Sequence, residues 1–181
     1  MKKIIVFTLA LFLVMNSFAT HNMAGDISYT HISGNTYRFS VRTFTNTANT
    51  AADRCELVLH IGNDSITIPR VNGPSSLCPS GHDGEMICTN VKYNLYQGVY
   101  TFPGNGVYTY SISDQNKSAG ICNVTNAVNT LFTLSGELTI NPFYGYCESP
   151  QYTGAALMQN IVGVISTYNP AVINAQGDSL Y

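Results

Sequence analysis

The stretch that decides the fold runs from Tyr96 to Asn116 and reads YQGVYTFPGNGVYTYSISDQN. Its centre, Pro103–Gly106, is typical of a turn, because proline presets one backbone dihedral while glycine and asparagine tolerate positive φ. After this turn, apolar side chains alternate with hydroxyl-bearing ones, and the apolar set is Tyr108, Tyr110 and Ile112. A period of two residues predicts a half-buried strand, so the stretch is interpreted as two strands joined by a tight turn.

The same alternation recurs along the chain without any strong helical period. It is clearest in four windows: Thr36–Thr45, Cys55–Ile61, Met86–Tyr96 and Thr130–Ile140. In the third window we expect Ile87, Val91, Tyr93 and Leu95 to share one side of a single strand. Short strands at regular spacing predict an all-β sandwich.

In immunoglobulin-like sandwiches, a tyrosine near the start of a late strand forms a hydrogen bond to the backbone through its hydroxyl. Tyr108 is the candidate for this role here. The alternative is that Tyr108 is simply a buried aromatic residue.

Charged residues form 10% of the chain, against roughly a quarter in ordinary soluble proteins, and the formal net charge is −2. Nucleic-acid binding needs clustered Lys and Arg, which this sequence lacks, so we expect no nucleic-acid partner.

The N-terminus has the pattern of a secretory signal peptide. Lys2 and Lys3 are the positive region, Ile4–Met15 is an apolar stretch too short to span a bilayer, and Ser17–Ala19 supplies the small residues that signal peptidase reads. We therefore expect a signal peptide over 1–19, a β-sandwich over 20–142, and the truncated start of a second β domain, or a linker, over 143–181. The mature protein is expected to be secreted or to lie on the cell surface, outside the outer membrane, without spanning a membrane.

Export makes disulfides possible, but the five cysteines allow roughly fifteen pairings with one thiol left over. Loop closure favours the neighbours Cys78 and Cys88, and Cys122 with Cys147 is the next choice. No cysteine or histidine spacing fits a zinc site.

Several short motifs resemble the PKD branch of immunoglobulin-like domains. They are Leu59–Asp64 and the hairpin Tyr100–Tyr110, with Leu59 standing where those domains place tryptophan. The order of three further motifs looks like the N-terminal region of gliding-motility-associated surface proteins of Bacteroidota, which leave the cell by type IX secretion: Thr20–Tyr29, Pro69–Gly73 and Ser113–Ile121. The resemblance implies a non-catalytic surface module that acts as a spacer or adhesion domain, whose partner is a surface protein or a glycan.

The tail Asn174–Leu180 resembles the calcium-associated motif of cadherin-like repeats, although Asp178 is the only acidic residue of that motif that is present here. Calcium binds six to eight oxygen ligands. Oxygen donors at segment ends therefore form a calcium hypothesis, with the candidate ligands Asp26, Asp114, Asn116 and Asp178. No other cofactor is expected.

Catalytic residues are not evident, and we expect no enzyme. Cys55 and His60 lie on opposite faces of one strand, and no serine has the Gly-x-Ser-x-Gly context of a hydrolase nucleophile.

The loop Asn72–Glu85, with His82 and Asp83, is the candidate contact surface, since long loops are commonly functional. The alternative is a carbohydrate-binding or accessory domain of an extracellular enzyme, with a tyrosine platform drawn from Tyr93, Tyr96, Tyr100, Tyr144, Tyr146 and Tyr152.

The first prediction concerns processing. Cleavage after Ala19 leaves a mature chain that begins at Thr20. N-terminal sequencing of the exported protein checks this, and an exported chain that still begins with Met1 would contradict it.

Overall fold

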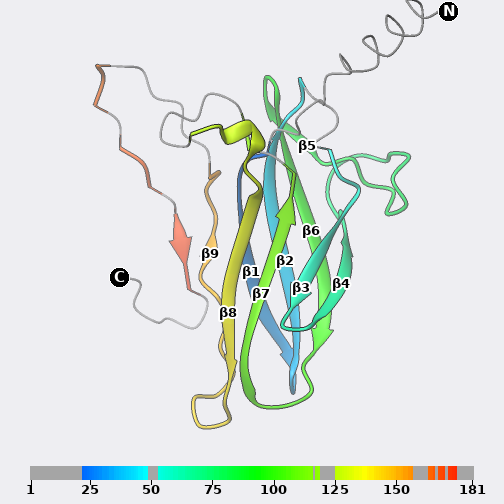
Figure 1. Ribbon diagram of the computed structural model, residues 1–181, viewed down its shortest axis with the longest axis vertical. Coiled ribbons are helices and arrows are strands. Elements are labelled where there is room, and N and C mark those ends of the chain that lie inside the picture. The colour runs from blue at the N-terminus through cyan, green and yellow to red at the C-terminus, as the bar shows by residue number, and fades with distance from the viewer. Residues whose placement is uncertain are drawn as a thin grey trace, which may run out of the picture.

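The computed structural model describes residues 22–48, 53–115, 117–118, 125–156, 163–165, 167–169 and 171–174. Within these ranges the chain is a sandwich of two antiparallel four-stranded sheets (Figure 1), as the alternation predicts. The expected signal peptide lies outside the described residues. In the part of the chain that is described, no helix is long and apolar enough to cross a membrane.

Sheet A has the strand order β1-β2-β6-β5. Its strands are β1 (Asn22–Ser33), β2 (Thr36–Asn46), β6 (Val91–Thr101) and β5 (Glu85–Cys88). Sheet B has the order β4-β3-β7-β8. Its strands are β4 (Asp64–Pro69), β3 (Glu56–Ile61), β7 (Gly106–Asp114) and β8 (Phe132–Ile140). A 3-10 turn, η2 (Ala127–Asn129), precedes β8, and β9 (Gln151–Tyr152) pairs with β10 (Val172–Ile173) in a small ribbon.

This strand order is that of an immunoglobulin domain. Lettering the eight strands A, B, C, C′, D, E, F and G in chain order gives sheets ABED and C′CFG, which is the constant-type arrangement with one added C′ strand. A hairpin turn at Gly62 and Asn63 joins β3 to β4. Pro69 ends β4, which is the edge strand of sheet B, as a proline in a strand requires.

The core lies between the sheets and is rich in aromatic rings. Tyr37, Phe39 and Leu59 are completely buried. The ring of Phe39 on sheet A lies 5.2 Å from that of Tyr110 on sheet B, in the edge-to-face geometry that aromatic pairs prefer. Leu59 occupies the core with these rings around it, so several tyrosines and phenylalanines supply the apolar volume in a chain without tryptophan.

Close contact between the sheets depends on a glycine in β6. A Cβ atom on Gly98 would collide with the side chain of Ile68 on β4. Ile68 is fully buried at this position, so the absence of a side chain at residue 98 lets the edge strand β4 pack directly over β6.

The expected single strand Met86–Tyr96 is wrong. A turn at Thr89 and Asn90, with Asn90 at φ 63°, divides it into β5 and β6. The predicted face is wrong as well, because Asn94 and Tyr96 point inward while Ile87 is exposed. Asn94 is tolerated in the interior because its amide donates to Thr45 Oγ1 at 3.1 Å, so a polar residue holds a core position that a pattern of apolar residues does not reveal.

The predicted role of Tyr108 is confirmed. Its hydroxyl donates to the carbonyl of Gly104, 3.0 Å away, across the turn between β6 and β7. This is the corner between strands E and F at which immunoglobulin-like domains place the same interaction.

Replacing Tyr108 with Phe tests the corner. We expect the free energy of unfolding to fall by about 1 kcal/mol, the usual net value of one hydrogen bond. Urea denaturation measures it. Tyr100→Phe is the control, because its hydroxyl bonds an exposed carboxylate, that of Asp64, which water can replace, so its cost should stay below about 0.5 kcal/mol. Equal losses in the two variants would contradict the assignment.

Candidate functional site

The predicted contact loop starts from a buried arginine. Arg70 follows β4 and is completely buried. Its Nη2 donates to Asp53 Oδ1 at 2.6 Å and to the carbonyl of Arg54, and its Nη1 lies 3.6 Å from Asp83 Oδ1. The guanidinium also lies over the ring of Tyr96 at 5.8 Å. A buried cation is costly unless it is paired, so these contacts allow Arg70 to remain in the interior.

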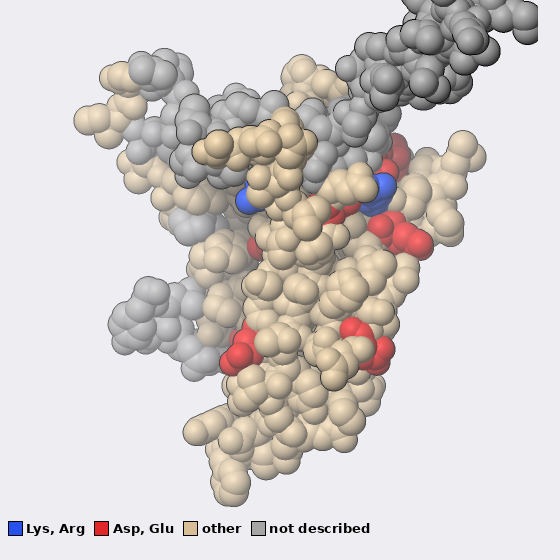
Figure 2. Space-filling view, viewed as in Figure 1, with Lys and Arg blue, Asp and Glu red and all other residues tan. Residues whose placement is uncertain are grey.

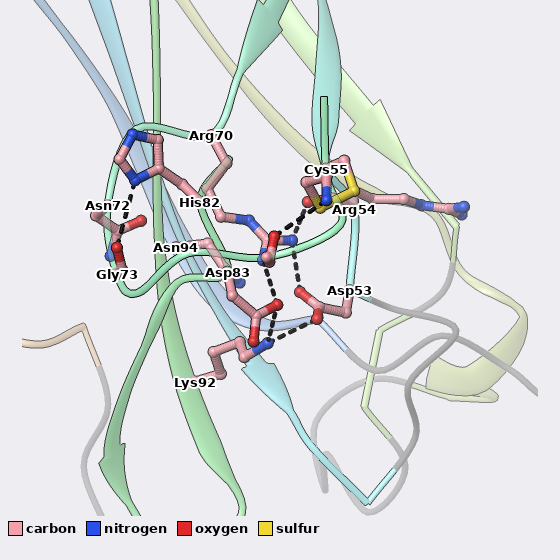
Figure 3. Close-up of polar contacts among 12 residues, drawn as sticks. Asp53, Arg54, Cys55, Arg70, Asn72, Gly73, His82, Asp83, Lys92 and Asn94 are labelled. Atoms are coloured by element: carbon pink, nitrogen blue, oxygen red, sulfur yellow. Dashed lines mark hydrogen bonds and ion pairs between the residues drawn. A yellow bond between two sulfur atoms is a disulfide. The ribbon is translucent and has the colours of Figure 1, made fainter. Parts of the chain in front are cut away.

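Lys92 on β6 completes a cluster of two cations and two anions, shown in Figure 3. Its Nζ lies 2.7 Å from Asp53 Oδ2 and 3.2 Å from Asp83 Oδ1. We call Asp53, Arg70, Asp83 and Lys92 the ion cluster. It joins the segment before β3, the end of β4, the loop and β6, and its formal charges sum to zero.

Tyr96 belongs to the wall of this cluster. Its hydroxyl donates to the carbonyl of Arg54 at 2.7 Å. Burial raises the pKa of Tyr96 to about 12, although the Arg70 charge acts in the opposite direction. The phenol therefore stays neutral and serves as a hydrogen-bond donor, and it is not an exposed member of a tyrosine platform.

A disulfide fastens the loop at a second point. Cys55, directly before β3, is bonded to Cys78 in the loop. The expected Cys78–Cys88 pair is therefore wrong, because loop length alone takes no account of β5, which holds Cys88 exposed on sheet A. The second expected pair, Cys122 with Cys147, is not tested, because Cys122 lies outside the described residues. The observed bridge closes a span of 23 residues, a length for which stabilisation is about 3 kcal/mol.

Backbone contacts fix the base of the loop. Asn72 behaves like an additional strand residue: its side chain accepts from the amide of Leu95 at 2.8 Å and donates to the carbonyl of Tyr93 at 3.1 Å. Gly73 lies so close to Gly84 that a Cβ atom would collide with the backbone there. The two ends of the loop are thus held together, while Leu77 near its tip is fully exposed.

His82 and Asp83, the polar candidates of the loop, are both engaged in contacts within the fold. His82 Nδ1 lies 3.3 Å from the carbonyl of Gly73, and Asp83 belongs to the ion cluster. Cys78, the thiol that the sequence places near them, is held in the disulfide. Together these groups fix the shape of the loop.

The four calcium candidates are not brought together within the described residues. Asp26 forms a two-pronged ion pair with Arg42 at 2.8–3.0 Å. Asp114 accepts from Arg54 at 3.2 Å and from Asn22 at 3.0 Å. Asn116 and Asp178 lie outside the described part of the chain. Among the residues that are described, no group of three His, Cys, Asp or Glu side chains could hold a metal ion, and the calcium site stays a prediction.

The tyrosines of the proposed platform are scattered. Tyr96 is buried, whereas Tyr144 and Tyr152 are exposed and Tyr146 stacks on His31 with ring centroids 3.8 Å apart. Only Tyr93 and Tyr152 line hollows on the same sheet face, and these hollows form a groove that the sequence did not indicate.

This groove, which we call the sheet A groove, lies on the outer face of β1, β2 and β6 beneath residues 151–155. It consists of two adjoining hollows of about 280 and 240 Å³ that share Arg42. The covering segment is anchored by Ser149, whose amide donates to the Tyr29 carbonyl at 3.1 Å while its hydroxyl accepts from the Tyr29 amide at 2.7 Å. Residues of the region expected to begin a second domain therefore pack along the free edge of β1 (Figure 1).

Comparisons of the chain with family models, curated proteins and solved structures found no match.

The ion cluster makes a prediction about stability. Asp53→Asn leaves Arg70 buried without its main counter-ion, so the free energy of unfolding should fall by about 3 kcal/mol. Asp83→Asn is the matched control, since the Asp83 side chain is 46% exposed, and its cost should stay below about 1 kcal/mol. Urea denaturation of the oxidised protein at neutral pH measures both. Equal costs would show that Asp53 is not the principal partner of Arg70.

Proposed function

We propose that this protein is a non-catalytic, exported cell-surface module that acts as an adhesion domain and presents the loop Asn72–Glu85. The observation that carries the proposal is the double fastening of this loop. The ion cluster holds its two ends, the Cys55–Cys78 bridge holds its middle, and Leu77 projects next to the bridge with its side chain fully exposed.

A rigid loop is well suited to contact, because a preorganised surface loses less conformational entropy on binding than a mobile one. Exposed apolar side chains on such loops are typical anchors of protein interfaces. A disulfide also suits a protein that works outside the cytoplasm. These points support the adhesive role over the role of a passive spacer.

The proposed context is the N-terminal region of a gliding-motility-associated surface protein, because the order of the sequence motifs resembles that of such regions. The immunoglobulin strand order and the Tyr108 corner support an immunoglobulin-like module of this kind. Figure 2 shows that the visible face, formed by sheet B, is largely uncharged. Few charges on a sheet face reduce repulsion between neighbouring modules at a crowded surface.

A second candidate function is glycan binding, which the sheet A groove favours. The groove is lined mainly by hydroxyl, amide and guanidinium groups, with tyrosines among them. Such a lining suits a polyhydroxylated ligand.

An adhesion assay tests the proposed function. Beads coated with residues 20–181 are passed under flow over cells of a gliding Bacteroidota species and over albumin-coated glass. We expect retention on the cells at least tenfold above that on albumin. Leu77→Asp should abolish this retention, because a carboxylate at the apolar anchor must be desolvated on contact.

Ile32→Asp is the matched control, since Ile32 is also an exposed apolar residue but lies at the other end of the sandwich. It should leave retention unchanged. Absence of retention for the unaltered chain would overturn the adhesive role, and equal retention of the Leu77 variant would show that the loop is not the contact surface.

A further inference from the structure

Most of the basic residues that the structure describes are neutralised in ion pairs. Among the described residues, Arg42 pairs with Asp26, Arg54 with Asp114, and Arg70 and Lys92 share Asp53 and Asp83. Arg38 and Lys117 form no ion pair with a described residue, and of these two only Arg38 lines the sheet A groove. Arg38 is exposed, and its guanidinium forms no hydrogen bond with any described residue. In a chain with so few charges, an uncompensated guanidinium within a groove is an unusual feature.

The register of sheet A explains why Arg38 has no partner. Arg38 lies opposite Thr30 of β1 and Val99 of β6, so its cross-strand neighbours carry no charge. The nearest acid on the same face of β1 and β2 is Asp26, which lies opposite Arg42, four residues along each strand. Both carboxylate oxygens of Asp26 already accept from Arg42. Arg38 therefore offers its five N–H donors to solvent or to a ligand.

The other groups around Arg38 form hydrogen bonds without carrying charge. The larger hollow is lined by Arg38 together with Ser40, Gln97 and Gln151. Gln97 Nε2 donates to Ser40 Oγ at 3.0 Å, which fixes the orientation of the amide and leaves its carbonyl oxygen to accept from a ligand. Tyr152 lies at the border of the hollow with 42% of its surface exposed. A guanidinium, amides and hydroxyls beside an aromatic ring match a sugar that bears a carboxylate.

A peptide fits this place less well. Extended peptides bind sheets by adding a strand at a free edge, where backbone groups are unpaired. The sheet A groove lies on the face of the sheet instead, where β2 is paired on both sides, with β1 and β6. Recognition must therefore come from side chains, which here are polar and rich in hydroxyl and amide groups.

We propose that the sheet A groove binds an acidic sugar, such as the uronic acid unit of a polysaccharide, with the sugar carboxylate on the Arg38 guanidinium. The hydroxyls of the sugar bond to Gln97, Ser40 and Gln151, and its ring lies against Tyr152. This inference names a ligand class for the glycan-binding candidate above, and it is independent of the loop Asn72–Glu85.

Binding of defined oligosaccharides tests the proposal. Residues 20–181 are titrated with oligogalacturonate, with a neutral glucan oligosaccharide of the same length, and with oligoglutamate as an acidic peptide. We expect saturable binding of oligogalacturonate only. Arg38→Gln should weaken it by about tenfold or more, since a charge-assisted, two-pronged contact is lost, and Arg38→Lys should restore part of the affinity.

Two further variants separate the groove from overall charge. Lys117→Gln removes one positive charge on a residue that lines neither hollow of the groove, so it should leave the affinity unchanged. Tyr152→Ala should weaken binding severalfold, because the sugar ring loses its aromatic contact. Circular dichroism confirms that each variant is folded.

The following outcomes of the binding experiments would overturn the proposal. An equal loss in the Lys117 variant would indicate unspecific attraction, equal binding of the glucan would remove the role of the carboxylate, and equal binding of oligoglutamate would remove the role of the sugar. Absence of oligogalacturonate binding would end the inference. Retention of the unaltered beads on cells would then still support adhesion through the loop, so the two failures can be told apart.

Discussion

The burial of the Arg70 guanidinium is the constraint on which the arrangement of this end of the sandwich depends. A cation without solvent needs anions and acceptors within hydrogen-bond reach. Asp53 and the Arg54 carbonyl come from the segment before β3, Asp83 from the loop, and Tyr96 and Lys92 from β6. The pairing of one side chain therefore ties both sheets and the loop into a single unit. The neighbouring Cys55–Cys78 bridge adds a covalent connection between the segment before β3 and the loop.

Low charge content gives the few ionic groups clear roles. Most described cations are paired, and their partners act in the structure: Asp26 with Arg42 on sheet A, Asp114 with Arg54 at the end of β7. Arg38 has no such partner, and it lies where the chain after β8 returns along β1 and forms a wall above the sheet. The loop and the groove thus lie on different parts of the sandwich, and the two proposed contacts can be altered separately.

Much of the fold could be predicted because alternation encodes burial directly. In the alternating window Thr36–Thr45, every second residue (Tyr37, Phe39 and Val41) points inward and is fully buried. Tyr108 forms the corner that its position after a turn suggested. The inward face of β6 was predicted wrongly because Asn94, a polar residue, lies on the core face and interrupts the alternation of apolar residues. The start of β6 was missed because the turn at Asn90 contains neither glycine nor proline. The candidate site was predicted only in part. The loop was identified by its length, but its clamp joins residues from Asp53 to Lys92, and no local pattern relates them.

The sequence by itself determined the class of fold, most of the turns and the inward face of most strands, since these depend on neighbours within a few residues. The tertiary structure alone decided which cysteines meet, that Arg70 lies buried among acids, and that Arg38 lies unpaired in a groove. Such facts depend on distances between segments far apart in the chain. Those distances follow from how two twisted sheets pack, and local propensity does not specify them.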